Sequence, residues 1–187
     1  MEYSLAGKKV AILIANGFAE LEMTQAQRAL LKAGAAPKVI APESGLVNGW
    51  MGKGWGHYFP ADKLIGEALG ADFDMLLLPG GERGVAKLSQ NPHTRRIVGH
   101  FLDAGKPIAA MDEGIGLMAV PGKLRNRRIT ALPGAEDALR AAGGVMVDDD
   151  VVVDSATVTV RGFDNLQTFV DELLRMFGTF DQMRDAA

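Results

Sequence analysis

The feature that most constrains the fold of this chain is a short uncharged run that ends at two acids. Residues 108–111 are apolar throughout, which is typical of a strand buried on both faces of a parallel sheet. Asp112 and Glu113 follow at once, then Gly114, and an apolar pattern that a helix can carry resumes after them. Open α/β sheets bind their ligands where the strands end, at the carboxyl edge. We therefore expect the chemistry of this chain to centre on Asp112.

Asp112 and Glu113 thus form a strand-to-helix corner. Further apolar runs and helical spacings alternate on both sides of this corner. The pattern predicts strands or short β segments at residues 10–14, 39–41, 75–78, 145–147, 151–153 and 157–160. It predicts helices at residues 19–33, 62–69, 82–88, 92–104, 135–142 and 164–177, the last of them ended by Gly178. The opening β-α-β unit is right-handed in nearly all parallel sheets. The economical interpretation is one three-layer α/β domain over residues 1–187.

The segment 42–60 departs from this pattern because it is rich in glycine and holds both tryptophans. We interpret it as a hairpin or a long loop. Its aromatic side chains either cover a sheet edge or a subunit contact, or form a lid near a pocket, since long loops often carry function. His57 lies in this segment and has no partner visible in the sequence.

The chain contains no cysteine, so thiolate nucleophiles, disulfides and cysteine metal ligands are excluded. The three histidines are scattered, and the acidic run 148–150 lacks the spacing of a calcium loop and is interpreted as a solvated turn. We predict no metal site and no cofactor. A net charge of -3 and the lack of an apolar run long enough to span a bilayer predict no nucleic-acid or membrane partner and a cytoplasmic location.

Several segments resemble the signatures of the ThiJ/PfpI family, in the order in which the family has them. They are residues 15–22 (ANGFAELE), 76–81 (LLLPGG) and 105–114 (GKPIAAMDEG), followed by the later segments 124–130, 151–154 and 158–161. The similarity covers about residues 8–178. It implies a flavodoxin-like three-layer α/β/α sandwich with a mainly parallel sheet, related to class I glutamine amidotransferases. It also implies a homodimer, with the aromatic residues 50–59 as a candidate contact.

The resemblance breaks at the corner itself. The family usually has Ala-Ile-Cys-His-Gly there, whereas residues 110–114 read Ala-Met-Asp-Glu-Gly. Asp112 thus replaces the cysteine and Glu113 the histidine, while Glu22 matches the glutamate that contacts the cysteine in many relatives. Cysteine-dependent peptidase, glyoxalase and deglycase activities are therefore not expected. The Glu113-Gly114 pair also resembles the corner of the C-terminal domain of large-subunit catalases, which lacks the nucleophile and is regarded as structural or chaperone-like.

The resemblance implies that Glu22 faces Asp112, and two close carboxyls share one proton. Asp112 could then mimic an oxidised family cysteine. It could be a nucleophile, with backbone N–H groups near Gly80, Gly81 and Glu113 stabilising the developing charge. It could also act with Glu22 as general acid and base. The remaining alternative is that Asp112 only caps the following helix, with Glu113 in the first turn for its charge.

Two functions are carried forward from these residues. The first is a family member without thiol chemistry, acting as a stress-related, chaperone-like or binding protein with a small-molecule ligand in a pocket at Asp112. The second is a small-molecule hydrolase, hydratase or glyoxalase-like enzyme that uses Asp112 with Glu22. The candidate catalytic residues are Asp112, Glu22 and Glu113, and the candidate ligand or oxyanion-binding residues are Gly80, Gly81 and Glu113.

Overall fold

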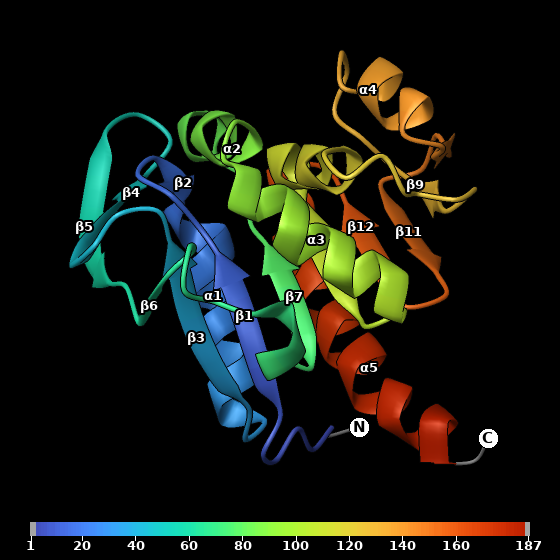
Figure 1. The fold of residues 1–187 in the computed structure, drawn as a ribbon, viewed down its shortest axis with the longest axis horizontal. Coiled ribbons are helices and arrows are strands. Elements are labelled where there is room, and N and C mark those ends of the chain that lie inside the picture. The colour runs from blue at the N-terminus through green and yellow to red at the C-terminus, as the bar shows by residue number, and fades with distance from the viewer. Residues whose placement is uncertain (1–2, 186–187) are drawn as a thin grey trace.

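A seven-stranded sheet runs through the middle of the molecule (Figure 1). The structure is a computed structural model that describes residues 3–185, with side chains described as far as residue 180. The strands lie in the order β11 (Val151–Asp154), β12 (Thr157–Val160), β8 (Ile108–Met111), β7 (Met75–Leu78), β1 (Lys9–Leu13), β3 (Ala36–Ala41) and β6 (Lys63–Leu64). Every neighbouring pair is parallel except β11 with β12.

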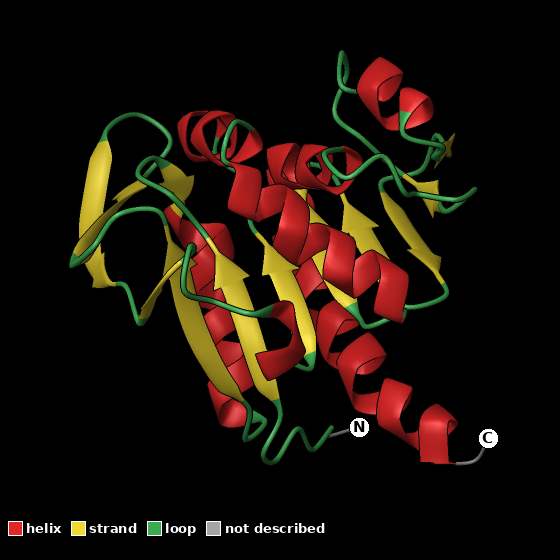
Figure 2. Ribbon diagram, viewed as in Figure 1, coloured by secondary structure: helices red, strands yellow, loops and turns green. Residues whose placement is uncertain are grey.

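Helices cover both faces of this sheet (Figure 2). One face packs against α1 (Glu20–Lys32) and α5 (Leu166–Asp185). The other packs against α2 (Glu82–Ser89), α3 (Pro92–Ala104) and the 3₁₀ helix η2 (Asp112–Ala119). The predicted flavodoxin-like three-layer α/β/α sandwich is therefore confirmed.

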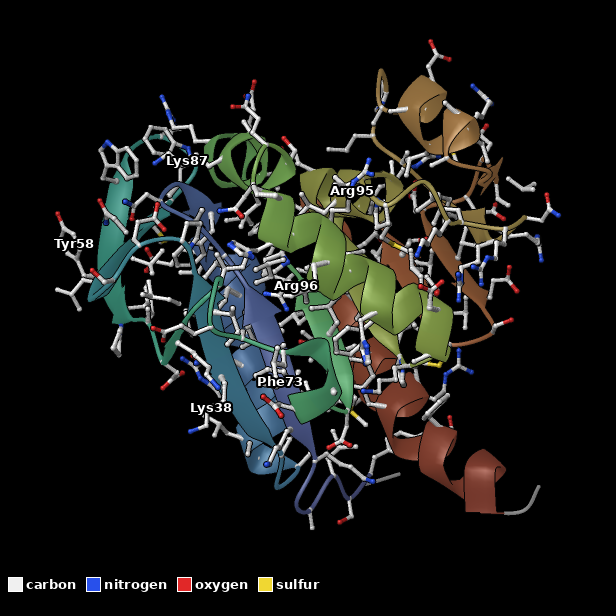
Figure 3. The ribbon with its side chains drawn as sticks, in the orientation of Figure 1. Lys38, Tyr58, Phe73, Lys87, Arg95 and Arg96 are labelled. Atoms are coloured by element: carbon white, nitrogen blue, oxygen red, sulfur yellow. The ribbon has the colours of Figure 1, made fainter. Side chains whose placement is uncertain are left out.

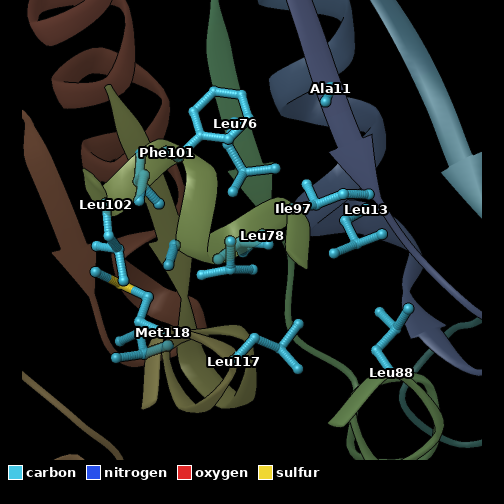
Figure 4. Packing of buried hydrophobic residues seen from close by; sticks show 14 of the residues in the cluster. Ala11, Leu13, Leu76, Leu78, Leu88, Ile97, Phe101, Leu102, Leu117 and Met118 are labelled. Atoms are coloured by element: carbon cyan, nitrogen blue, oxygen red, sulfur yellow. The ribbon is translucent and has the colours of Figure 1, made fainter. Parts of the chain in front are cut away.

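The central strands are uncharged because both of their faces are covered. Along β8, Ile108 and Ala110 contribute to one apolar core, whereas Ala109 and Met111 contribute to the other. Figure 4 shows the first of these cores, where β7 side chains meet α3 and η2. Alternate residues of a strand point to opposite faces, so a strand between two cores, such as β8, has no position for a charged side chain until it ends.

Two smaller β units flank the main sheet. Residues 42–60 contain the hairpin β4 (Leu46–Trp50) and β5 (Trp55–Pro60), which joins β2 (Phe18–Ala19) in a three-stranded sheet. At the other end, β9 (Arg128–Ile129) pairs with β10 (Val145–Met146) beside α4 (Glu136–Ala141). The hairpin interpretation of the aromatic segment is thus confirmed.

The predicted helix over residues 62–69 is wrong. Its first residues form β6, which pairs with the end of β3, and Asp62 Oδ2 accepts a hydrogen bond of 2.7 Å from the backbone N–H of Val39. Turns and the short 3₁₀ helix η1 (Gly70–Asp72) follow. Arg96 on α3 donates to the carbonyls of Ala68 and Ile65, so this backbone is held by the neighbouring helix.

The predicted end of the last helix at Gly178 is also wrong, because α5 continues to Asp185. A Cβ at Gly178 would lie 2.7 Å from Cδ1 of Tyr3. The glycine therefore allows a close approach of the N-terminal segment and does not stop the helix. None of the helices in residues 3–185 combines the length and the apolarity that crossing a bilayer requires.

Candidate active site

Asp112 stands at the sharp corner between β8 and η2. Its φ of +50° is in the left-handed region, which costs a non-glycine residue about 1 kcal/mol or more and is found at functional sites. A Cβ on the nearby Gly114 would collide with the carbonyl oxygen of Leu78 and lie 2.5 Å from that of Pro79. The corner can therefore pass close to the end of β7 only with glycine at this position.

The carboxylate of Asp112 is held by the loop that follows β12. Asp112 Oδ1 accepts a hydrogen bond of 2.6 Å from the backbone N–H of Gly162. The N-cap of η2 is Met111, and the printed hydrogen bond of the Asp112 side chain goes to the loop after β12 instead of the backbone of η2. The helix-cap alternative is therefore wrong, because the side chain is directed to a neighbouring strand end and not to its own helix.

The structure brings the other two predicted acids to the same point. Glu22, only 5% exposed, reaches from α1 and accepts a 3.0 Å hydrogen bond from the N–H of Gly80. Glu113 accepts a 3.0 Å hydrogen bond from the N–H of Gly81. Glu22 and Asp112 face each other closely enough for their carboxyls to interact through a hydrogen bond.

Burial is the main reason why this group of acids holds a proton. Burial, reinforced by the negative charge of Asp112, raises the pKa of Glu22 to about 8, although the Gly80 N–H opposes the shift. Burial also raises the pKa of Asp112, against the Gly162 hydrogen bond that lowers it. The hydrogen bond between the two carboxyls raises the pKa of Glu22 and lowers that of Asp112. At neutral pH, the Glu22–Asp112 pair therefore holds one proton, which the hydrogen bond between the two carboxyls shares.

Gly80 and Gly81 lie at the site, as the sequence predicts, but their N–H groups are already in use. Each donates to a carboxylate, Gly80 to Glu22 and Gly81 to Glu113. A Cβ at Gly80 would lie 2.5 Å from Glu113 Oε2, so glycine leaves room for the acids. In this arrangement neither N–H is directed at a position where an oxyanion could form.

These acids line a cavity of about 550 Å³, which we call the Asp112 cavity. The volume is in the range of small-molecule sites. Its walls come from α1, the hairpin, the start of α2, the corner and the loop after β12, and the lining residues are Gly17, Ala19, Glu20, Leu21, Glu22, Trp50, Met51, Gly52, Gly81, Glu82, Arg83, Asp112, Glu113 and Phe163. Trp50 and Met51 support the lid alternative for the aromatic segment, whereas Tyr58 is 65% exposed on the outer side of the hairpin (Figure 3).

A contact between Glu20 and His57, which the sequence did not reveal, fixes the hairpin to the cavity wall. Glu20 is only 4% exposed, and its carboxylate accepts from the backbone N–H of His57 at 2.8 Å and lies 2.5 Å from His57 Nδ1. A Cβ at Gly49 or Gly56 would meet this carboxylate. The partner of His57 is thus 37 residues away, and only the register of β4 against β5 places the two glycines around Glu20.

The contact that Arg83 makes at the mouth of the cavity was also not predicted from the sequence. Its guanidinium carbon lies 4.1 Å from the ring centroid of Trp50 and 5.8 Å from that of Trp55. The two indole rings meet edge to face at 5.4 Å. Trp50 and Arg83 belong to different elements, so no local spacing in the sequence indicates their contact.

Within the part of the chain that the structure describes, no group of three or more acids and histidines is arranged to hold a metal ion. The acidic run 148–150 is exposed but not purely solvated. Asp148 and Asp150 bind the guanidinium of Arg161 at 2.8 and 3.0 Å. The run therefore supports the loop that carries the Gly162 N–H.

The fold and the corner define a flavodoxin-like protein whose site residue stands at a strained strand-to-helix corner of the parallel sheet. The chain belongs to the DJ-1/PfpI family, whose model matches residues 8–176. The resemblance seen in the sequence is thereby confirmed.

Two relatives and one solved structure illustrate the range of this similarity. Protein/nucleic acid deglycase 2 of Escherichia coli (strain K12) is 34% identical over 173 residues, which cover 91% of this chain and 98% of the relative. A deglycase of Pyrococcus horikoshii is 30% identical over 168 residues, covering 90% and 98%. The crystal structure of a ThiJ/PfpI domain protein from Brachyspira murdochii has a TM-score of 0.82 at 22% identity, covering 93% of this chain and 98% of that one, and shows the fold alone.

Proposed function

We propose that this chain is a member of the DJ-1/PfpI family without thiol chemistry that binds a small organic cation, such as an ammonium compound, in the Asp112 cavity. One observation carries the proposal. The backbone N–H groups of Gly80, Gly81 and Gly162, which converge on the site, all donate to side-chain carboxylates.

This arrangement does not favour nucleophilic catalysis. Attack of Asp112 on a carbonyl would create a negative oxygen, which needs free N–H donors nearby. Here Gly80 and Gly81 donate to Glu22 and Glu113 instead. A developing oxyanion would face acceptors and negative charge, so the deglycase names of the relatives are not transferred to this chain.

The charge of the site favours a ligand that donates hydrogen bonds. With one proton shared by Glu22 and Asp112, the acids leave the floor of the cavity negatively charged, and Asp112 and Glu113 are half-buried. A half-buried carboxylate attracts an opposite charge more strongly than an exposed one, because the dielectric there is lower. Trp50 and Phe163 line the same cavity and offer apolar surface to the remainder of the ligand.

Phenethylamine, which has one ammonium group and one ring, is a suitable probe. We expect isothermal titration calorimetry to detect its binding to the native chain at about pH 7. Asp112→Asn and Glu113→Gln should each weaken it by about tenfold, since each removes one charge-assisted contact. The control is Glu67→Gln, an exposed acid outside the lining of the cavity. Preference for the anion 3-phenylpropanoate over phenethylamine would overturn the proposal.

A second candidate, an acid–base enzyme, is favoured by the raised pKa of Glu22. Burial raises the pKa of both Glu22 and Asp112, and carboxyls with raised pKa values in a cavity are typical of proton-transfer sites. The test is a screen of methylglyoxal, small esters, amides and a peptide with the native chain, Asp112→Ala and Asp112→Cys. Activity of the native chain that disappears in Asp112→Ala supports this candidate. Activity only in Asp112→Cys, or in none of the three, contradicts it.

A further inference from the structure

We propose that the natural ligand of the Asp112 cavity is a zwitterion, a free amino acid with an apolar side chain, and that Arg83 binds its carboxylate. The inference rests on the proposed function, because the ammonium group of the ligand would meet Asp112 and Glu113. It adds a second recognition element, a fixed cation at the opposite end of the ligand.

The guanidinium of Arg83 is held in place but not neutralised. It lies over the ring of Trp50 at 4.1 Å. Among the described residues it makes no ion pair with a carboxylate and no hydrogen bond. Arg161 and Arg125, in contrast, each bind an aspartate at 3.0 Å or less. The planar fork of Arg83 is therefore ready to bind a carboxylate in a bidentate manner.

The backbone around Arg83 is shaped for this placement. Gly17 has a φ of +93°, and a Cβ there would lie 2.5 Å from Cβ of Arg83. The stack on Trp50 also restricts the side chain before any ligand arrives. A preordered side chain loses less conformational entropy on binding than a free one.

Arg83, Asp112 and Glu113 line one cavity, and they come from different elements: Arg83 belongs to α2 and stacks on Trp50 of the hairpin, whereas the two acids belong to the corner. An amine alone would satisfy the acids and leave Arg83 without an acceptor. A carboxylic acid alone would satisfy Arg83 and be repelled by Asp112 and Glu113. A molecule that carries both groups satisfies both ends, and its side chain can contact Trp50 and Phe163.

Three probes that differ by one group test this inference. They are L-phenylalanine, L-phenylalaninamide, which lacks the carboxylate, and 3-phenylpropanoate, which lacks the ammonium group. We expect calorimetry at low ionic strength to rank phenylalanine above the amide by about fivefold to tenfold, and 3-phenylpropanoate last, because the floor is acidic. The amide also represents the N-terminus of a peptide, so the ranking separates a free amino acid from a peptide end.

Arg83→Gln should remove the advantage of phenylalanine over the amide, so the readout is the ratio of the two affinities in each protein. The matched control is Arg95→Gln, an exposed arginine on α3 (Figure 3) that does not line the cavity. It should retain the full ranking.

The contrary results separate the two proposals. Equal binding of phenylalanine and the amide, with no effect of Arg83→Gln, overturns the zwitterion and leaves a cation-binding cavity. Failure of both ammonium probes, or tighter binding of 3-phenylpropanoate than of either, overturns the zwitterion and the proposed function together.

Discussion

The carboxyl of Glu22, buried at the start of α1, faces the carboxyl of Asp112 at the corner after β8, and burial keeps a proton between them. The folded protein therefore binds a proton that the unfolded chain releases in the interval from about pH 4.5 to about pH 8. In this interval the folded state holds more protons than the unfolded state. Its stability must fall as the pH rises, by up to about 1.4 kcal/mol per pH unit from this group.

Glu22→Gln should flatten this dependence. Glutamine can accept from Gly80 and donate to Asp112 as the protonated acid does, but it has no proton to lose. We expect urea unfolding at pH values between about 5.5 and 8 to show a steeper loss of stability in the native chain than in the variant. Identical slopes for the two proteins would show that Glu22 is not protonated in the folded state.

Binding of phenethylamine should strengthen as the pH rises through about 8. Deprotonation of Glu22 adds a negative charge to the floor of the cavity, while an aliphatic ammonium group keeps its charge to about pH 10. We expect about threefold to tenfold tighter binding by the native chain at about pH 8.5 than at about pH 6.5. Glu22→Gln should bind equally at both, and a native affinity that fell with pH would contradict the charge assignment.

Gly114→Ala should be strongly destabilising. The added Cβ would collide with the backbone carbonyl of Leu78, which cannot move without disturbing the end of β7. We expect a loss of about 3 kcal/mol in the free energy of unfolding, at the upper end for overpacked cores. Gly116→Ala is the control in the same helix, because a Cβ there meets nothing within 4 Å. Equal stabilities of the two variants would refute the close approach of the corner to β7.

His57→Ala should leave the buried carboxylate of Glu20 short of one hydrogen-bond partner. Because the His57 side chain is 80% exposed, water replaces part of the lost contact, and we expect a loss of about 1 kcal/mol that shrinks in a Glu20→Gln background, where no charge remains. A double-mutant cycle measured by urea unfolding gives the coupling. The neighbouring Tyr58→Ala, on the exposed side of the hairpin, should show no coupling to Glu20. Additive effects of the His57 and Glu20 changes would show that the pair does not hold the hairpin.

The fold and the position of the site were largely predictable because they depend on local sequence. A run of uncharged residues ended by Asp112 indicates a buried strand and its carboxyl edge without knowledge of any other contact. The fold and the place of Glu22 beside Asp112 also followed from the resemblance to the family. These are the features that sequence periodicity and shared motifs record.

The features that were missed depend on distant contacts. The pairing of Glu20 with His57 requires the register of β4 against β5, and the contact of Arg83 with Trp50 requires the placement of the whole hairpin over α2. Residues 62–69 have helical spacing, but pairing with β3 prevailed over it. Gly178 was taken for a helix end because its contact with Tyr3 is not visible in the sequence.

The carboxylates of the corner have a consequence for any attempt to rebuild a thiol enzyme here. Glu22 and Glu113 each accept a hydrogen bond from the loop after β7, and Asp112 accepts one from the loop after β12. A cysteine in place of Asp112 would supply the nucleophile and at the same time remove the hydrogen bond from the N–H of Gly162. Converting this chain to thiol chemistry therefore requires a new hydrogen bond to the loop after β12, installed together with the sulfur.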